Sequence, residues 1–249
     1  MYCHGSSPDR VTGFISMQTS TVIMLIIITL LVFGYFWLAR KLDAANRADW
    51  GNKTANRIDG LNRLFMHKYH RLPMESLNLP VEGPAIVVAN HISGLDAFML
   101  LASSRRPLHF LIAAEQYHRF GFKWLFDLSG CIPVEKTTRP ERALRAALRA
   151  LEEGKVIALF PFGRMHLDNE TPIKIKGGVA VLAGRSGATI YPARIENTAV
   201  KNEVMHAIIK RGYPRFLPLK PIKIEENETP REMLSRLSAT LSSPIEEAT

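Results

Sequence analysis

An apolar run near the N-terminus constrains this chain more than any other feature. Residues 21–39 (TVIMLIIITLLVFGYFWLA) form a stretch of nineteen without a charged side chain. At a rise of ~1.5 Å per residue, a helix of that length covers ~28 Å, close to the hydrocarbon thickness of a bilayer. Tyr35 and Trp37 stand near its C-terminal end, and amphipathic rings favour the membrane interface. The run therefore predicts a transmembrane helix.

A cleaved signal peptide is the alternative interpretation of this run. Signal peptides carry positive charge before the apolar stretch and small residues at a cleavage site after it. Here Arg10 is the single basic residue upstream, and two basic residues follow the run at once. We therefore expect an uncleaved anchor over residues 21–39, preceded by an N-terminal segment of residues 1–20. The sequence leaves open whether the chain starts at Met1 or at Met17.

Basic residues are concentrated directly after the apolar run. Residues 40–71 contain eight Lys or Arg against three Asp, and the whole chain has a net charge of +9. By the positive-inside rule, this distribution predicts a membrane crossed once, with the body on its cytoplasmic face. Nucleic acid is the other partner that suits a basic chain, but the sequence lacks zinc-ligand spacing, basic heptads and aromatic-glycine RNA motifs. Membrane phospholipids are therefore the expected partner, and the oligomeric state is left open.

Residues 40–80 are predicted to connect the anchor to the globular domain. Apolar side chains at Ile58, Leu61, Leu64 and Phe65 are spaced as on one face of a helix. That pattern suits a basic amphipathic helix lying along the membrane surface, although an ordinary solvated helix fits it equally well. Prolines then break the chain into a connector.

The remaining residues, 81–249, alternate short apolar runs with helical patterns, which is typical of an α/β domain. The expected fold class is α/β, a mixed sheet flanked by helices, with right-handed crossovers between parallel strands. The run AIVVA at residues 85–89 predicts a buried strand. The other strands are expected at 108–113, 131–135, 156–160, 188–195 and near 220–224, and the helices at 96–102, 120–128, 138–154, 176–184 and from 229 onward.

His91 and Asp96 are the side chains most suited to chemistry. His91 directly follows the first predicted strand, where α/β proteins commonly place functional groups. If Gly94 lets the chain turn, the Asp96 carboxylate folds back to the imidazole. One ring nitrogen is then held in a hydrogen bond while the other stays free as a base. Cys3 and Cys131 are far apart in sequence, so neither a disulfide nor a metal site is expected.

The segment around this pair, NHISGLD at residues 90–96, resembles the NHxxxxD motif of the glycerolipid acyltransferases. That family contains 1-acyl-glycerol-3-phosphate acyltransferase. Three further segments resemble its other blocks and follow in its order: residues 130–136 (GCIPVEK), 160–164 (FPFGR) and 190–195 (IYPARI). The resemblance implies an O-acyltransferase of phospholipid biosynthesis that acts at a membrane.

The resemblance also implies a role for individual residues. His91 is the base that deprotonates an acceptor hydroxyl, Asp96 orients it, and the acyl donor is acyl-CoA or acyl-carrier protein. No metal and no further cofactor is implied. Cations of the second and third blocks hold the acceptor's phosphate, which arginine can bind in bidentate fashion. The oxyanion would need fixed donors, for which the backbone around Gly163 is one possible source. The substrate-binding residues implied in this way are Arg164, Gly163, Lys136 and Arg139.

Phe162 departs from the family's pattern, because the third block usually carries Glu at this position. Loss of that glutamate removes an anion beside the acceptor site. Phe162, which takes its place, is a predicted substrate contact. The expected acceptor is lysophosphatidic acid or another lysophospholipid. Lys174 and Lys176 could meet a head group or the phosphates of CoA, although most such lysines are solvated. Two alternatives stay open: a catalytically weak lipid-binding homologue, and a lipid or thioester hydrolase that uses the same base.

Overall fold

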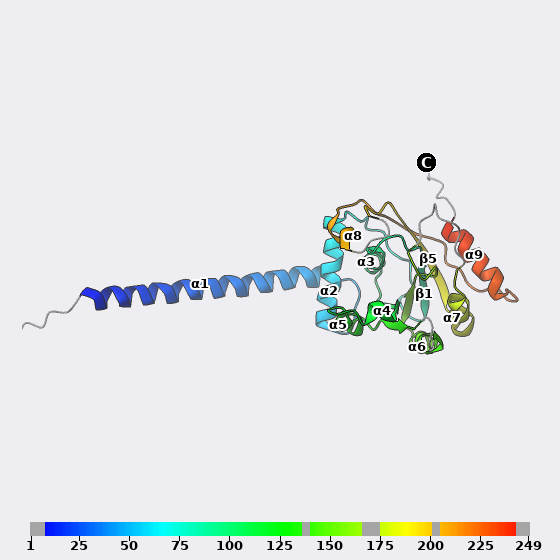
Figure 1. The fold of residues 1–249 in the computed structure, drawn as a ribbon, viewed down its shortest axis with the longest axis horizontal. Coiled ribbons are helices and arrows are strands. Elements are labelled where there is room, and N and C mark those ends of the chain that lie inside the picture. Colours follow the sequence, from blue (N-terminus) through cyan, green and yellow to red (C-terminus); the bar gives the residue numbers. More distant parts are fainter. Residues whose placement is uncertain (1–7, 136–139, 166–174, 201–204, 243–249) are drawn as a thin grey trace, which may run out of the picture.

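The structure is a computed structural model that describes residues 8–135, 140–165, 175–200 and 205–242. Helix α1 (Pro8–Ala45) projects from the body of the protein (Figure 1). Its part Ser20–Ala45 is long and apolar enough to cross a membrane. Leu31 and Phe33 in this part are 68% and 71% exposed, an apolar surface that the other described residues leave uncovered. Helix α1 is therefore a candidate membrane span, and it runs beyond the predicted end of the anchor.

Six strands form one sheet in the order β3-β2-β4-β1-β5-β6. The first five of these run parallel, and β6 pairs antiparallel with β5. The predicted mixed sheet is thus confirmed. The strands are β1 (Ala85–Ala89), β2 (Leu108–Ala113), β3 (Ile132–Val134), β4 (Val156–Leu159), β5 (Thr189–Glu196) and β6 (Arg215–Pro218).

Helices cover both faces of this sheet, as a parallel sheet requires. On β1, Val87 and Ala89 join the core cluster that contains α3, while Ile86 and Val88 join the cluster of α6, α7 and α9. Figure 1 shows α6, α7 and α9 on the side of the body away from α1. The helices are α2 (Lys53–Leu64), the π-helix η1 (Phe65–Tyr69), α3 (Asp96–Ala102), α4 (Ala114–Tyr117), α5 (Lys123–Leu128), α6 (Pro140–Glu152), α7 (Gly178–Ser186), α8 (Met205–Ile209) and α9 (Pro230–Ser242).

The last strand lies earlier in the chain than predicted. The prediction near residues 220–224 was wrong by a few residues, because β6 ends at Pro218 and the chain then pairs with the sheet through an isolated bridge. In that bridge, the backbone groups of Ile222 exchange two hydrogen bonds with Ile190, at 2.8 and 2.9 Å. Between the two pairings, the N–H of Leu219 donates to the carbonyl of Pro192 at 2.9 Å, but Pro192 has no N–H to return and Pro221 has none to donate.

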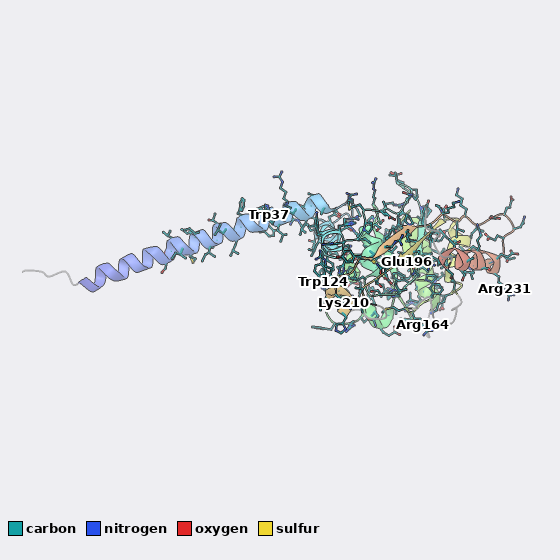
Figure 2. The ribbon with its side chains drawn as sticks, turned by 90° about the horizontal axis from the view of Figure 1, so that it is seen from above. Trp37, Trp124, Arg164, Glu196, Lys210 and Arg231 are labelled. Carbon is teal, nitrogen blue, oxygen red and sulfur yellow. The ribbon has the colours of Figure 1, made fainter. Side chains whose placement is uncertain are left out.

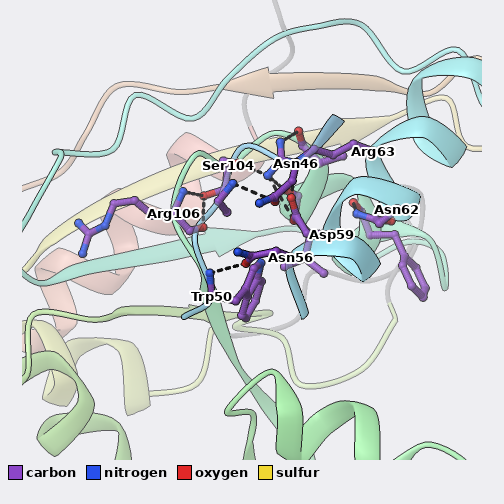
Figure 3. Close-up of polar contacts among 12 residues, drawn as sticks. Asn46, Trp50, Asn56, Asp59, Asn62, Arg63, Ser104 and Arg106 are labelled. Carbon is purple, nitrogen blue, oxygen red and sulfur yellow. Dashed lines mark hydrogen bonds and ion pairs between the residues drawn. The ribbon is translucent and has the colours of Figure 1, made fainter. Parts of the chain in front are cut away.

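Helix α2 buries two charged side chains in the body and leaves Leu61, on the predicted apolar face, exposed. Leu61 is 55% exposed, whereas Asp59 and Arg63 are 5% and 3% exposed. Arg63 forms an ion pair with Asp59 and donates to the backbone carbonyl of Ala102 at 2.7 Å, at the C-terminal end of α3 (Figure 3). Partners on both sides offset the cost of burying the two charges. Helix α2 is thereby fixed to the helix that carries Asp96 at its other end.

Helix α2 also crosses the end of α1 at close range. A Cβ atom on Gly60 would lie 2.0 Å from the backbone oxygen of Leu42, so only a glycine permits this approach. Beside the crossing, Arg57 donates to Asp43 at 3.0 Å and to the hydroxyl of Tyr35 at 3.2 Å. Helices α1, α2 and α3 are therefore linked in series, from the candidate membrane span to the segment that contains His91 and Asp96.

Candidate active site

The side chain of Asn90 fixes the end of the central strand. Its amide nitrogen donates to the carbonyl of Ile195 at 2.8 Å, and its oxygen accepts from the N–H of the same residue at 2.7 Å. Asn90 is 5% exposed, so both bonds are shielded from water. The side chain thus continues the pairing of β1 with β5 by one position. His91 follows at the carboxyl end of a parallel strand, the usual place for functional groups in α/β sheets.

His91 and Asp96 are directly bonded. The His91 Nδ1 and Asp96 Oδ2 atoms lie 2.7 Å apart, and Asp96 is fully buried. The same oxygen accepts the backbone N–H groups of Ile92 at 2.7 Å and Ser93 at 2.9 Å. Asp96 is also the first residue of α3, where the helix dipole favours a negative charge. An Asp96 oxygen that accepts two backbone N–H groups is matched by an Nδ1–H donor on His91, the tautomer that leaves Nε2 free.

A ring from the third block holds the imidazole in plane. The rings of His91 and Phe160 are stacked, with centroids 4.1 Å apart and an interplanar angle of 13°. Phe160 is in turn stacked on Phe110, at 6.0 Å. The side chain of His91 stays 22% exposed although its Nδ1 edge faces a buried carboxylate. The accessible edge is therefore the one that carries Nε2.

The third block turns sharply at Gly163. Its φ angle is +71°, a left-handed conformation in which glycine is favoured. A Cβ atom here would lie 2.4 Å from Nζ of Lys176, so the Lys176 side chain crosses the turn. The N–H of Gly163 donates to the carbonyl of Phe160 at 3.1 Å, and the Lys176 N–H donates to that of Pro161 at 3.0 Å. The Gly163 N–H is therefore engaged within the turn, which removes it from the expected oxyanion donors.

The other residues predicted to bind substrate lie in different parts of the structure. Arg164 lies on the surface of the body, as Figure 2 shows, next to the Gly163 turn. Phe162 is 8% exposed and packs in the core cluster of α6, α7 and α9 rather than in the cluster that holds Phe160. Lys136 and Arg139 lie outside the described residues. The structure thus brings His91 and Asp96 together with the third block, and directs Phe162 into the core.

The fold brings Lys176 to the third block. Its position twelve residues after Arg164 gives no local signal, because only the fold returns the start of α7 to the third block. The close approach to Gly163 adds a second cation to the Arg164 side of the site. A glycine at a turn, followed some residues later by a lysine-glycine pair, is the weak signal that the sequence offered.

Neither nearby nucleophile is suited to covalent catalysis. Burial raises the pKa of the Cys131 thiol to about 11, which keeps it protonated at neutral pH. Ser93 is fully buried, and its hydroxyl oxygen accepts the N–H of Leu95 at 3.4 Å. Within the described residues, no three His, Cys, Asp or Glu side chains gather into a metal-binding group. The arrangement is suited to a base that activates an external hydroxyl group.

Comparison with known proteins supports the predicted resemblance. A family model described as Acyltransferase matches residues 71–196. The chain is 24% identical over 164 residues to the chloroplastic 1-acyl-sn-glycerol-3-phosphate acyltransferase of Arabidopsis thaliana, covering 64% of this chain and 46% of that protein. It is 26% identical over 167 residues to an N-acylphosphatidylethanolamine synthase of the same plant, covering 63% of this chain and 54% of the relative. The chain therefore spans about half the length of these curated relatives.

A solved structure shares the fold. The crystal structure of the 1-acyl-sn-glycerophosphate acyltransferase PlsC from Thermotoga maritima superposes with a TM-score of 0.59 and 19% sequence identity. The alignment covers 89% of this chain and 91% of that one. At this identity the similarity establishes the fold class, an α/β sheet flanked by helices, as the sequence predicted.

Proposed function

This chain belongs to the acyltransferase family, and on that premise we propose that it transfers a fatty acyl group from acyl-CoA or acyl-carrier protein to the free hydroxyl of a lysophospholipid. The observation that carries the proposal is the bond of 2.7 Å between Nδ1 of His91 and the buried carboxylate of Asp96. This bond leaves Nε2 as a base at the accessible edge of the imidazole. The proposed reaction needs no cofactor besides the acyl donor.

In the proposed mechanism, Nε2 of His91 takes the proton from the acceptor hydroxyl while its oxygen attacks the thioester carbonyl. A tetrahedral oxyanion forms, and its collapse breaks the carbon–sulfur bond. The leaving thiolate takes the proton back from the imidazolium, so the base is regenerated. Asp96 stays ionised throughout and stabilises the imidazolium, because its Oδ2 also accepts two backbone N–H groups.

The proposed acceptor site lies at the Gly163 turn. Phe160 links this turn to the base by stacking on His91, and Lys176 crosses the turn beside Arg164. A lysine that crosses the turn and an arginine that follows the turn in sequence suit a phosphate, which Arg164 can hold in bidentate fashion while Lys176 supplies a point charge. Lys136 and Arg139 stay predictions for the same role.

Phe162 bears on the identity of the acceptor. Its side chain packs into the core, so the carboxylate that the family carries at this position is replaced by packing rather than by another polar contact toward the site. An acceptor that relies less on that carboxylate is therefore favoured. The first two acceptors to compare are therefore lysophosphatidic acid and lysophosphatidylethanolamine.

The deciding experiment supplies purified full-length protein in lipid nanodiscs with acyl-CoA or acyl-carrier protein and a panel of lysophospholipids. We expect transfer to at least one of them, and its loss in the His91→Ala variant. His118→Ala is the matched control, because His118 is an exposed histidine outside the motif. Release of free fatty acid without transfer would instead favour the hydrolase, and equal turnover by His91→Ala and wild type would refute the base.

We propose that α1 crosses the membrane once and that the body lies on the cytoplasmic face. The apolar stretch Ser20–Ala45 and the basic excess after it support this orientation. A C-terminal tag should be digested by protease only after inside-out vesicles expose the cytoplasmic face, and an N-terminal tag only from the opposite side. Digestion of both tags from the same side would contradict a single crossing.

A further inference from the structure

We propose that the turn of residues 119–124 (RFGFKW) is a second membrane contact, which inserts aromatic side chains into the interface of an anionic phospholipid bilayer beside α1. This inference concerns how the body lies on the membrane. It does not depend on the reaction that the protein catalyses.

The turn exposes three large aromatic side chains within five residues. Phe120 is 101% exposed, Trp124 57% and Phe122 44%. Aromatic side chains bury the largest areas of any residue type in cores and interfaces, so their exposure in water is unfavourable. A contiguous exposed patch of this kind marks a surface that something else covers.

The turn is a built structure that presents these rings outward. The N–H of Phe122 donates to the carbonyl of Arg119 at 3.1 Å, and Gly121 between them has a φ angle of +85°. This is the geometry of a type II turn, which requires a glycine-like conformation at its third position. The helix predicted over residues 120–128 therefore starts only at Lys123, as α5.

A row of stacked aromatic rings links the turn to the body of the protein. Phe122 is stacked on Phe126, with centroids 6.2 Å apart, and Phe126 is stacked on Tyr117 at 5.7 Å. The hydroxyl of Tyr117, which is itself buried, donates to Asp127 at 2.6 Å. These contacts hold the backbone of the turn in place, and Phe120 is fully exposed at its tip.

The turn lies at the end of the body from which α1 leaves. Figure 1 shows α5 beside α2 at that end, and Figure 2 shows Trp124 and Lys210 there, with Arg231 at the opposite end. The interface level on α1 is marked by Trp37, whose ring lies 5.3 Å from the Lys41 ammonium, as in the aromatic belts of membrane proteins. A span that enters the bilayer at this level brings the same end of the body against the lipid.

Charge identifies the lipid as the occupant. Arg119 and Lys123 flank the aromatic side chains, and basic residues outnumber acidic ones eight to three over residues 40–71 next to the span. Lys123 is partly offset by Asp127, to which it donates at 2.6 Å. Aromatic tips between basic residues are the composition of surfaces that bind anionic bilayers. The continuity with α1 favours a membrane over a protein partner.

Fluorescence quenching in nanodiscs tests the proposal. The full-length chain has three tryptophans, so Trp37→Phe combined with Trp50→Phe leaves Trp124 as the single emitter. Lipids that carry a nitroxide at the head group, the upper chain or the chain end then report its depth. We expect blue-shifted emission and the strongest quenching from the shallow labels, since interfacial aromatics reach about 5–10 Å into the head-group region.

The matched control moves the emitter to the far end of the body. In the same background, Trp124→Phe combined with Arg231→Trp places the single tryptophan on an exposed position of α9. The control should be quenched by aqueous acrylamide and by none of the lipid labels. Equal lipid quenching of both emitters, or a Trp124 that only acrylamide quenches, would overturn the proposal. Protection of Trp124 from both quenchers would assign the turn to a second copy of the chain and would overturn it as well.

A second variant separates membrane contact from folding. Phe120 is fully exposed, so Phe120→Ser removes no packing within the chain and should leave the thermal unfolding temperature unchanged. Quenching of Trp124 by the shallow lipid labels should fall severalfold in this variant, because the tip no longer holds the turn in the interface. Unchanged quenching in a variant that folds normally would show that Phe120 does not contact lipid.

Discussion

The two sides of the site are built in different ways. On the side of the base, Asp96 accepts three hydrogen bonds, Asn90 fixes the preceding strand end, and Phe160 covers the imidazole. On the side of the proposed acceptor, Arg164 and Lys176 are exposed cations on long side chains. The proposed base is thus held by buried groups, whereas the proposed recognition of the acceptor would depend on side chains that can adapt. Changes on the first side should reduce kcat, and changes on the second should raise the KM of the acceptor.

The largest effect is expected from Asp96→Asn. An amide in this buried position no longer fixes the proton on Nδ1 of His91, nor does it stabilise the imidazolium. By analogy with the Ser-His-Asp triad, kcat should fall ~10⁴-fold. The measurement is the rate of acyl transfer at saturating donor and acceptor. Asp127→Asn, at a half-exposed carboxylate, is the control and should keep wild-type kcat. A loss of less than tenfold in Asp96→Asn would mean that the pair is not the catalytic unit.

Asn90→Leu should have the next largest effect. It removes both hydrogen bonds to Ile195 and loosens the strand end that carries His91. Misplacement by about 1 Å can cost ~10²-fold in rate, so kcat should fall by that order with little change in either KM. The N–H and C=O groups of Ile195 would lose their hydrogen-bond partners, which should also lower the free energy of unfolding by about 1–3 kcal/mol.

Calorimetry and kinetics together check this prediction, with rates measured well below the unfolding temperature. Asn62→Leu is a useful comparison, because it removes one bond to the carbonyl of Phe98 in α3 without touching the strand end. If both variants lose the same fraction of kcat, Asn90 contributes only to general stability.

A smaller effect, on a different constant, is expected from Lys176→Met. The change keeps the length of the side chain and removes its charge from the Gly163 turn. A hydrogen bond to a charged group contributes about 1.5–3 kcal/mol, so the acceptor KM should rise at least ~10-fold while kcat stays near the wild-type value. Lys220→Met removes an exposed lysine elsewhere and is the control. A rise in the donor KM instead would assign Lys176 to the phosphates of CoA.

The smallest effect should come from Phe160→Leu. It keeps the apolar contact with His91 but removes the ring stacking, which contributes about 0.5–1.5 kcal/mol. We expect kcat to fall by a few-fold, and Phe160→Tyr to restore most of it because the ring is retained. Equal losses in both variants would mean that the size of residue 160, rather than its aromatic face, positions the base.

Local patterns predicted the base side of this comparison well. The AIVVA run gave a strand that is buried along its whole length, and the carboxylate five residues after His91 folds back because α3 begins at Asp96. These features depend on neighbouring residues, which a sequence displays directly. The same holds for the apolar stretch of α1.

Such local patterns could not predict contacts between segments that are distant in the sequence. Periodicity identified the apolar face of α2 that contains Leu61, but it could not reveal that Arg63 and Asp59 are buried, with a carbonyl of α3 as a partner of Arg63. The approach of Lys176 to Gly163 arises only when α7 packs against the sheet. The engaged N–H of Gly163 likewise depends on turn geometry that no residue type reveals.

Gly60 has a consequence for how variants of this protein should be judged. It lies outside every block that identifies the family, on a helix with no catalytic group. Any other residue there would place a Cβ atom 2.0 Å from the Leu42 oxygen and force α1 and α2 apart. A ranking of substitutions by their distance from His91 would classify a change at Gly60 as harmless. Such a variant would leave the His91–Asp96 pair intact and yet change the orientation of the body relative to the candidate membrane span.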